Sequence, residues 1–303
     1  PASAYCVVDG SQSAAGAIDW SGWGGDITGA GFRDASRAGL TAETAKKLTL
    51  KWTFAFPDAT QARSQPALVD DLLITGSQWG EVYALDQATG CIRWSFSAGA
   101  AVRGAISVTD AGENRRIVHF ADYLTNVYAL DASDGRLIWK TKVGRHKDAA
   151  VTGSVSVHAG RVYVPLTSME VAAAGDPAYQ CCTSSGAVVA LDAQNGTELW
   201  YHRVIPEPAK QVGSTSVGTG IFAPSGAPVW SSPTVDAARG RLYIGTGENY
   251  TRPATDQSDA VIAVELRTGA LAWSFQGTRE DAYNYACSLP GDHPSCPKPA
   301  GPD

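Results

Sequence analysis

This 303-residue sequence contains a single methionine and lacks the signatures of several protein classes. No apolar run approaches the ~18 residues that a membrane-spanning helix needs, so we expect no membrane span. Lysine and arginine are scattered and number 24 against 30 aspartates and glutamates, which argues against a nucleic-acid groove. The five histidines show no metal-binding spacing. Only 18% of the residues are charged but 44% are hydrophobic, which is near the globular average and excludes wholesale disorder.

Cysteine patterns for bound metal and haem are also missing. No CxxC spacing occurs, which leaves a thiolate zinc site without support, and no CxxCH occurs, so we expect no haem c within this chain. The six cysteines form an even set in a long chain, which indicates disulfides made in an oxidising compartment. Cys287 and Cys296 bracket a short proline-rich loop, and we expect them to pair. Because Pro1 is not a natural start, we expect a signal peptide to have been removed or to lie upstream, and the protein to be periplasmic or secreted.

The sequence does contain a repeat, and four copies of it align without gaps. Each copy starts with an alternating apolar strand, continues through an acidic residue and a turn closed by glycine, and reaches a tryptophan at the end of a second strand. A glycine four residues before each tryptophan suits a tight hairpin, because such turns need a position with positive φ. A further strand precedes each copy, at 72–77, 116–122, 161–168 and 241–248. The copies are VYALDQATGCIRW (82–94), VYALDASDGRLIW (127–139), VVALDAQNGTELW (188–200) and VIAVELRTGALAW (261–273).

The period of this repeat predicts β-propeller blades. Trp52, in the expected strand LTLKWTF, lies 42 residues before Trp94, and Trp94 lies 45 residues before Trp139. About four short strands per unit at this spacing are typical of blades that each hide one face against the next. We therefore expect an all-β propeller in which the tryptophans are wedges between blades. A β-sandwich with coincidental hairpins would not explain the shared register of the four copies.

Later units carry insertions. The next tryptophan spacings are 61 and 73 residues, and the extra residues fall around 169–182, 204–228 and 249–258, in expected loops between strands. Insertions at one end of a repeat array are where binding and chemistry usually reside. The residues from Gln276 onward enter a further unit without reaching its hairpin. Since a propeller closes into a ring to remove its edges, we interpret 1–303 as a single, C-terminally incomplete propeller domain.

The hairpin pattern A-x-D-x-x-x-G-x-x-x-W resembles the tryptophan-docking motif of the quinoprotein alcohol dehydrogenases. These are eight-bladed propellers that use pyrroloquinoline quinone (PQQ), so about half to two-thirds of the blades would be present here. The resemblance covers nearly the whole chain from about Trp20. It is strongest to polyvinyl-alcohol-dehydrogenase-like members, which share a Y-x-C-C-T run and a D-x-x-N-x-x-C stretch. Non-catalytic propellers, including outer-membrane assembly lipoproteins, share the docking motif alone.

This resemblance implies a set of metal and cofactor residues. Glu170, which follows an inner strand, would be a ligand of the Ca²⁺ beside PQQ. In VWSSPTVDAARGRLYIGTGENYT (229–251), Trp230 would stack on one face of the quinone and Asn249 would be a second calcium ligand. Glu248, inserted before Asn249, is an alternative ligand. A carboxylate and an amide carbonyl form a hard oxygen set, which suits Ca²⁺.

The expected catalytic base departs from the family pattern. In REDAYNYAC (279–287) the base position aligns with Asn284, which cannot accept a proton at neutral pH. Asp281 and Glu280 are the nearby carboxylates, and Asp281 is the base that we expect. Ala286 stands where lanthanide-using relatives carry an extra aspartate, which favours Ca²⁺.

The adjacent Cys181 and Cys182 could form a vicinal disulfide or pair separately with distant partners such as Cys6 or Cys91. We expect the vicinal ring. In the resembling enzymes such a ring packs flat against PQQ, although their cysteine pair lies elsewhere in the sequence.

Three further polar residues are expected PQQ contacts. Arg103 and Thr152 begin inner strands, where polar groups could hold the PQQ carboxylates. Ser168 is similarly placed before Glu170. Without a ligand, Arg103 would be an ordinary surface residue and Thr152 a strand-favouring one.

Together these features predict the N-terminal part of a PQQ- and Ca²⁺-dependent alcohol dehydrogenase. Its substrate would be a secondary alcohol, including polymeric ones such as polyvinyl alcohol. A carboxylate base would take the alcohol proton while hydride passes to the Ca²⁺-bound quinone. Electrons would leave to a cytochrome c, whose haem lies outside this chain. The alternative is a non-catalytic scaffold that binds other proteins; Asn284 is the one residue in its favour.

Overall fold

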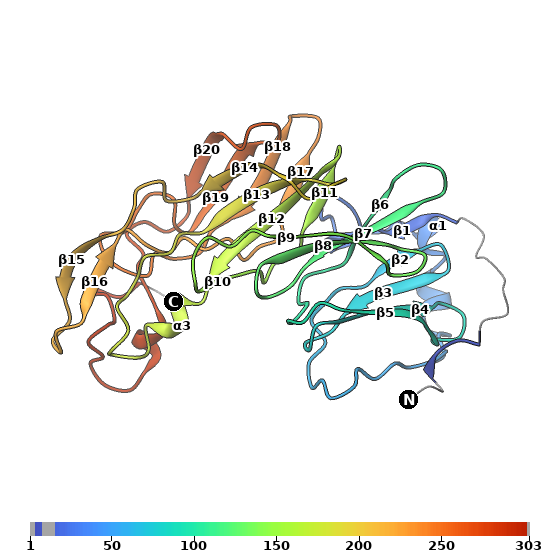
Figure 1. Cartoon of the computed structure of the whole chain (residues 1–303), viewed down its shortest axis with the longest axis horizontal. Coiled ribbons are helices and arrows are strands. Elements are labelled where there is room, and N and C mark those ends of the chain that lie inside the picture. Colours follow the sequence, from blue (N-terminus) through green and yellow to red (C-terminus); the bar gives the residue numbers. More distant parts are fainter. Residues whose placement is uncertain (1–3, 8–15, 302–303) are drawn as a thin grey trace.

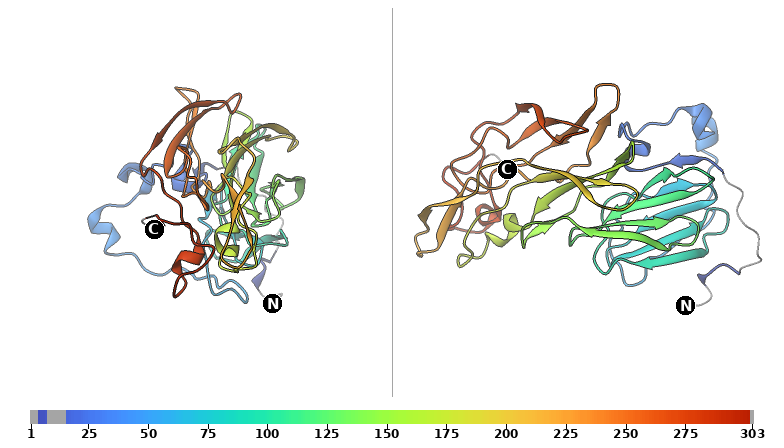
Figure 2. Two further views of the ribbon diagram at one scale, coloured as in Figure 1. Left: turned by 90° about the vertical axis from the view of Figure 1, so that its left-hand side faces the viewer. Right: turned by 45° about the horizontal axis from the view of Figure 1, so that its top comes forward.

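The chain folds almost entirely into antiparallel β-sheets that follow one another along its long axis (Figure 1, Figure 2). The structure, a computed structural model, describes residues 4–7 and 16–301. In these ranges four sheets have four consecutive strands, each pairing with the next along the chain. Blade 1 is β2 (Ala67–Val69), β3 (Leu72–Gly76), β4 (Glu81–Asp86) and β5 (Ile92–Ser97); blade 2 is β6 (Ser107–Asp110), β7 (Arg116–Ala121), β8 (Asn126–Asp131) and β9 (Leu137–Lys142); blade 3 is β11 (Ser156–His158), β12 (Arg161–Ser168), β13 (Ala187–Asp192) and β14 (Glu198–Arg203); blade 4 is β17 (Thr234–Asp236), β18 (Arg241–Gly245), β19 (Ala260–Glu265) and β20 (Leu271–Gln276).

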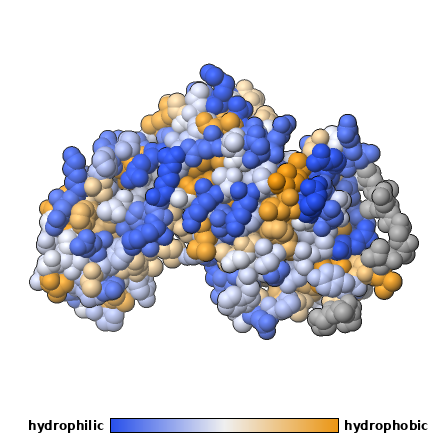
Figure 3. Space-filling view, viewed as in Figure 1, coloured by the Kyte–Doolittle hydropathy of each residue, from blue (hydrophilic) through white to orange (hydrophobic). Residues whose placement is uncertain are grey.

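The remaining elements are short. The strand β1 (Ile18–Trp20) extends blade 1 by pairing with β2, and β10 (Ala149–Ala150) pairs with the end of β12. The helices are α1 (Ala35–Ala38), α2 (Ala42–Ala45), α3 (Glu170–Ala173) and the 3-10 turns η2 (Trp23–Gly25) and η3 (Tyr285–Ser288). Within 4–7 and 16–301, no helix is long and apolar enough to cross a membrane. Polar and apolar residues are interspersed on the face shown in Figure 3.

The blades confirm the predicted all-β propeller and bury their hydrophobic faces against each other. One cluster joins β2–β5 to β6–β8 and includes Val69, Trp94 and Phe120. The next lies between blades 2 and 3, and the third lies between blades 3 and 4. Each blade is therefore stabilised by its neighbour, as expected where a sheet is too small to hide its own apolar surface.

The predicted role of the tryptophans as interblade wedges is confirmed. Trp94 docks on the hairpin turn of the following blade, where its Nε1 donates to the Ala132 carbonyl at 2.8 Å. The turn glycine there, Gly135, has φ 73°, and a Cβ on it would lie 2.6 Å from the indole. Trp52, Trp139 and Trp200 dock on the following hairpins in the same way.

Two details of the predicted strands were wrong. The second hairpin strand continues three residues beyond the tryptophan, because the ladder runs on to pair Glu81 with Ser97. The segment LTLKWTF (48–54) forms no strand, since no neighbour among the described residues offers it a ladder, although Trp52 docks as its counterparts do.

The insertions are more ordered than the expected loops. The segment 169–182 contains α3, and the segment 204–228 contains a β-hairpin of β15 (Lys210–Ser214) and β16 (Gly220–Ala223). Both lie at the same end of the molecule as the residues after β20 (Figure 1).

A buried histidine lies at the interface between blades 2 and 3. His119, on β7, is fully buried, its Nε2 lies 3.4 Å from the Ala193 carbonyl, and its ring packs 6.0 Å from that of Trp139. Burial lowers the pKa of His119 to about 4, because the charged imidazolium would lose its hydration.

We expect this residue to weaken the fold in mild acid. Between its ordinary pKa of 6.5 and about 4 the unfolded chain binds a proton that the folded chain does not. The free energy of unfolding therefore falls as pH decreases through this window, by about 3 kcal/mol in total. In urea unfolding across these pH values, His119→Phe should fall less steeply than the unmodified chain. Identical slopes would contradict this assignment.

Candidate functional site

Four residues at one position of the repeat line a single pocket. Arg63, Arg103, Thr152 and Trp230 each lie four residues before the innermost strand of their blade, which is β2, β6, β11 or β17. Together with Trp23 of η2 they line a cavity of about 410 Å³. Since every blade repeats one geometry, residues at one repeat position come together where the innermost strands begin.

The floor of this pocket is built from close contacts between neighbouring blades. Ala105 N donates to Ser154 Oγ at 2.8 Å, and Ser154 N donates to Ser232 Oγ at 3.0 Å. A Cβ on Gly153 would lie 2.6 Å from the Ser231 carbonyl oxygen, so only glycine allows this approach. These contacts hold the lining residues of three blades in fixed relative positions.

The pocket combines positive charge with an exposed aromatic face. Trp230 is 63% exposed, although most tryptophans of the repeat are buried. Burial and the nearby Arg63 charge lower the pKa of Arg103, whose guanidinium lies 5.6 Å from the Tyr123 ring. No carboxylate of the described residues lines the pocket. Two uncompensated guanidinium groups beside an indole suit a flat, anionic ligand.

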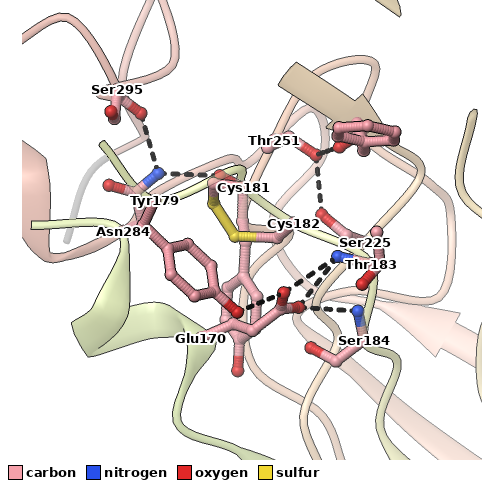
Figure 4. Close-up of a disulfide and its surroundings, with 12 residues drawn as sticks. Glu170, Tyr179, Cys181, Cys182, Thr183, Ser184, Ser225, Thr251, Asn284 and Ser295 are labelled. Carbon is pink, nitrogen blue, oxygen red and sulfur yellow. Dashed lines mark hydrogen bonds between the residues drawn. A yellow bond between two sulfur atoms is a disulfide. The ribbon is translucent and has the colours of Figure 1, made fainter. Parts of the chain in front are cut away.

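Glu170 occupies a second, buried part of the site. It opens α3 directly after β12, and only 1% of it is exposed. Its carboxylate accepts from Tyr179 Oη at 2.9 Å, Thr183 N at 2.9 Å and Ser184 N at 2.6 Å (Figure 4). These donors stabilise and orient a carboxylate that would otherwise be costly to bury.

A polar network connects Glu170 to the surface. The single hydroxyl proton of Tyr179 is shared between Glu170 and Asp148, whose carboxylate oxygen lies 2.6 Å from Tyr179 Oη, and Lys147 donates to both Asp148 and Tyr179. Burial and these two carboxylates raise the pKa of Tyr179. His146, Asp148 and Glu170 offer ligand atoms within 4.8 Å of one another. His146 is already engaged, however, because its Nδ1 accepts from Asp148 N and its Nε2 lies 3.0 Å from Thr183 Oγ1.

The disulfides agree with the two predicted pairings and add a third. Cys181 and Cys182 form a vicinal disulfide, and Cys287 pairs with Cys296. Cys6 and Cys91, 85 residues apart, form the third bridge. The vicinal ring is buried with Tyr250 and lies beside the Glu170 carboxylate (Figure 4).

Asn249 is fully buried and directly precedes Tyr250, which packs with this ring. Its Nδ2 donates to the Ser225 carbonyl at 2.9 Å and its Oδ1 accepts from Thr255 N at 2.7 Å. Gly226 connects it to the Glu170 region, since Gly226 forms a bridge with Asn249 and donates its N–H to the Ser184 carbonyl. Glu248, the alternative ligand, is half-buried, and its carbonyl accepts from Ala227 N.

The two candidates for the base position are both buried. Asn284 donates to the Tyr250 and Ser295 carbonyls and accepts from Ala286 N, so its amide holds the turn η3 in place. Asp281 is 2% exposed and lies against the Gly301 backbone, where a Cβ would meet its Oδ1. These hydrogen bonds give Asn284 a structural role. Asp281 directly precedes Ala282, which forms a bridge with Asn249.

The structure thus brings most of the predicted residues into two adjoining groups. The segment 227–230 connects them, because Val229 N donates to the Leu166 carbonyl of β12 and Trp230 follows at once. Ser168 does not line the pocket of Arg63, Arg103, Thr152 and Trp230, which we call the cationic pocket. Its Oγ accepts from Glu170 N and so supports the start of α3. Sequence reasoning missed Arg63, although its place in the repeat, equivalent to that of Arg103, could have revealed it.

Comparison with known proteins identifies the family of this chain. The PQQ family model described as "Glucose/ethanol/alcohol dehydrogenase, beta-propeller domain" matches residues 20–292. The chain belongs to this PQQ propeller family. Within it, the chain is 36% identical to a polyvinylalcohol dehydrogenase of Pseudomonas sp over 94% of its length, and 35% identical to one of Sphingopyxis sp. (strain 113P3) over 95%.

The chain corresponds to part of these relatives and shares its fold with a solved structure. The chain spans 44% of each of these two relatives, less than half of their length. The crystal structure of quinohemoprotein alcohol dehydrogenase from Comamonas testosteroni superposes with a TM-score of 0.67 at 20% identity, covering 89% of this chain and 43% of that one. This likeness supports the propeller fold.

Proposed function

We propose that this chain supplies the PQQ and Ca²⁺ site of an alcohol dehydrogenase. The main observation behind this proposal is that one pocket is lined by Arg63, Arg103, Thr152 and Trp230. Among the residues that the structure describes, no aspartate or glutamate lines it. PQQ is a planar quinone that bears carboxylates. Two guanidinium groups would pair with those carboxylates, and the exposed indole would stack on the rings.

The buried group fits a hard cation. Ser184 Oγ is buried beside Glu170 and has no hydrogen-bond partner among the described residues. The Glu170 carboxylate is held in place by three donors, and the Asn249 carbonyl oxygen accepts from Thr255 N at 2.7 Å and, in a longer contact of 3.4 Å, from Thr255 Oγ1. Oxygen donors of this kind suit Ca²⁺. Glu170 and Asn249 would be its protein ligands, with Glu248 as the alternative.

Different residues of this chain would then have different roles in the reaction. When bound, Ca²⁺ and PQQ supply a Lewis acid and a hydride acceptor. Asp281, whose neighbour Ala282 forms a bridge with Asn249, would accept the alcohol proton. The buried ring of Cys181 and Cys182 would exclude water and give the cofactor a rigid surface.

The substrate and partners follow from the relatives and from the cysteines. Because two relatives are named polyvinylalcohol dehydrogenases, we propose secondary alcohols, including polymeric ones, as substrates. Electrons would pass to a cytochrome c, whose haem lies outside this chain. Three disulfides support a periplasmic or secreted location. A purely structural scaffold is not favoured, because Asn284, its one supporting residue, is explained by its bonds to Tyr250, Ser295 and Ala286.

A PQQ titration followed by tryptophan fluorescence tests this proposal. We expect saturable quenching in Ca²⁺ and weaker binding after chelation. Arg63→Ala and Arg103→Ala should each weaken PQQ about tenfold, since a hydrogen bond to a charged group contributes about 1.5–3 kcal/mol. Arg136→Ala, on an exposed hairpin turn, is the matched control and should bind as the unmodified chain does.

The carboxylates of the cofactor provide a second control. PQQ trimethyl ester lacks the negative charges, so it should bind weakly and lose its dependence on Arg63 and Arg103. An absence of PQQ binding, or equal binding by all three variants, would refute the site.

A further inference from the structure

A groove separate from the cationic pocket lies between the β15–β16 hairpin and the residues around the Cys287–Cys296 disulfide. Its volume is about 400 Å³. Val212 and Ser214 line it from the hairpin, Pro294 and Pro297 line it from the opposite wall, and Thr251 and Ser295 lie between them. We call it the rim groove. Its volume falls within the range of small-molecule sites, about 300–1,000 Å³.

Both walls of the rim groove are fixed in place. On the hairpin side, Thr219 Oγ1 donates to the Pro177 carbonyl at 2.7 Å, which ties β16 to the segment after α3. On the other side, the disulfide holds Cys296, and the Arg252 guanidinium donates to the Pro299 and Glu280 carbonyls at 2.8 Å. A groove braced in this way does not have to be ordered by its ligand, which reduces the entropic cost of binding.

The rim groove directly adjoins the buried part of the candidate site. Thr251 Oγ1 bonds to Ser225 Oγ at 2.6 Å, and the Ser225 carbonyl accepts from Asn249. The Ser295 carbonyl accepts from Asn284 at 3.0 Å. Figure 4 shows Thr251 and Ser295 on opposite sides of the vicinal disulfide. A molecule in the groove would therefore lie next to the residues expected to bind the metal and the reacting alcohol.

The lining of the groove combines hydroxyl, apolar and charged groups. Hydroxyl groups of serine and threonine and the apolar surfaces of valine, isoleucine and proline both line it. Its charged residues are engaged within the chain, because Lys298 pairs with Asp292 and Arg252 donates to two carbonyls. Ser295 is 8% exposed, and its Oγ has no hydrogen-bond partner among the described residues. A buried hydroxyl without a partner costs free energy, and a ligand hydroxyl would recover it.

We propose that the rim groove binds a stretch of a linear polyol, in which CH₂ and CHOH groups alternate, next to the alcohol group being oxidised. The CH₂ groups would contact the valine and proline side chains, and the hydroxyls would bond to Ser214 and Ser295. The Thr251 hydroxyl is already engaged, because it donates to the Phe222 carbonyl and bonds to Ser225 Oγ. This inference deepens the proposed function and rests on it. It assigns recognition of a polymer to residues that the cofactor does not need.

The test is a calorimetric titration of the chain, without PQQ or Ca²⁺, with a short polyvinyl alcohol fraction. We expect saturable binding that falls at least tenfold in Gly213→Trp. Gly213 lines the groove, and no heavy atom lies within 4 Å of the position of an added Cβ, so we expect an indole there to obstruct the groove without disturbing the exposed strand β15. Val217→Trp, at the 63% exposed tip of the same hairpin, is the matched control and should bind normally.

Two further arms define the ligand chemistry. Ser295→Ala removes the hydroxyl but keeps the carbonyl that accepts from Asn284, and it should weaken binding several-fold. Polyethylene glycol, which lacks hydroxyls along its chain, and dextran, which lacks the alternating backbone, should not bind. An absence of binding by the unmodified chain, equal binding by Gly213→Trp, or equal binding of dextran would overturn the proposal. A PQQ titration of the same samples reports separately on the cofactor site.

Discussion

Replacing Glu170 by glutamine is expected to weaken Ca²⁺ binding by about 100-fold or more. Loss of the groups that only orient a metal ligand already costs about 10–100-fold, and this change removes the ligand charge itself. The glutamine amide would also direct N–H groups at Thr183 N or Ser184 N, which now donate to the carboxylate. Isothermal calorimetry of the PQQ-saturated protein with Ca²⁺ measures the effect.

Two neighbouring residues provide graded controls for this measurement. Tyr179→Phe removes one of the donors to Glu170 and should weaken Ca²⁺ binding about tenfold. Asp148→Asn alters the outer end of the network, two hydrogen bonds away from the metal site, and should have the smallest effect. If Asp148→Asn weakened binding more than Glu170→Gln, the ion would have to lie on the His146 and Asp148 side.

Replacing Trp139 by alanine is expected to lower the free energy of unfolding by about 3–5 kcal/mol, the usual cost of deleting a large buried aromatic side chain. Trp139 is 8% exposed, packs on the Gly196 turn of blade 3 and donates to the Ala193 carbonyl at 3.0 Å. Chemical denaturation followed by circular dichroism measures the loss.

The same chain offers a matched tryptophan. Trp273 occupies the equivalent hairpin position in blade 4 but is 44% exposed, because no following hairpin among the described residues receives it. Trp273→Ala should lower the free energy of unfolding by about 1 kcal/mol or less. Equal losses for the two substitutions would show that docking between blades contributes little to stability.

The propeller could be predicted because its information is local and repeated. The acidic residue, glycine and tryptophan of each hairpin lie within a short segment, and four copies share one register. The hairpin β15–β16 and the helix α3 escaped prediction, since they occur once and follow no repeat. The bridge between Cys6 and Cys91 also escaped, because a pair 85 residues apart depends on tertiary contacts.

The candidate site was only partly predictable. Glu170, Trp230 and Asn249 belong to recognisable segments. In the structure Trp230 lines the cationic pocket, Glu170 accepts from Thr183 N directly after the vicinal disulfide, and Asn249 forms a bridge with Gly226. The role of Ser168 depends on where β12 ends and α3 begins. The sequence pattern predicts this boundary only to within about one or two residues. The rim groove joins two insertions, and no sequence period connects them.

The residue type at the position four residues before each innermost strand varies from blade to blade, whereas the hairpin residues that hold the blades together do not. The hairpins that hold the blades together keep the same residue types in blade after blade, whereas this position holds arginine, arginine, threonine and tryptophan. Each blade therefore contributes one variable side chain to the cationic pocket. A combinatorial library at 63, 103, 152 and 230 would sample new ligand chemistries while leaving the tryptophan docking between blades intact.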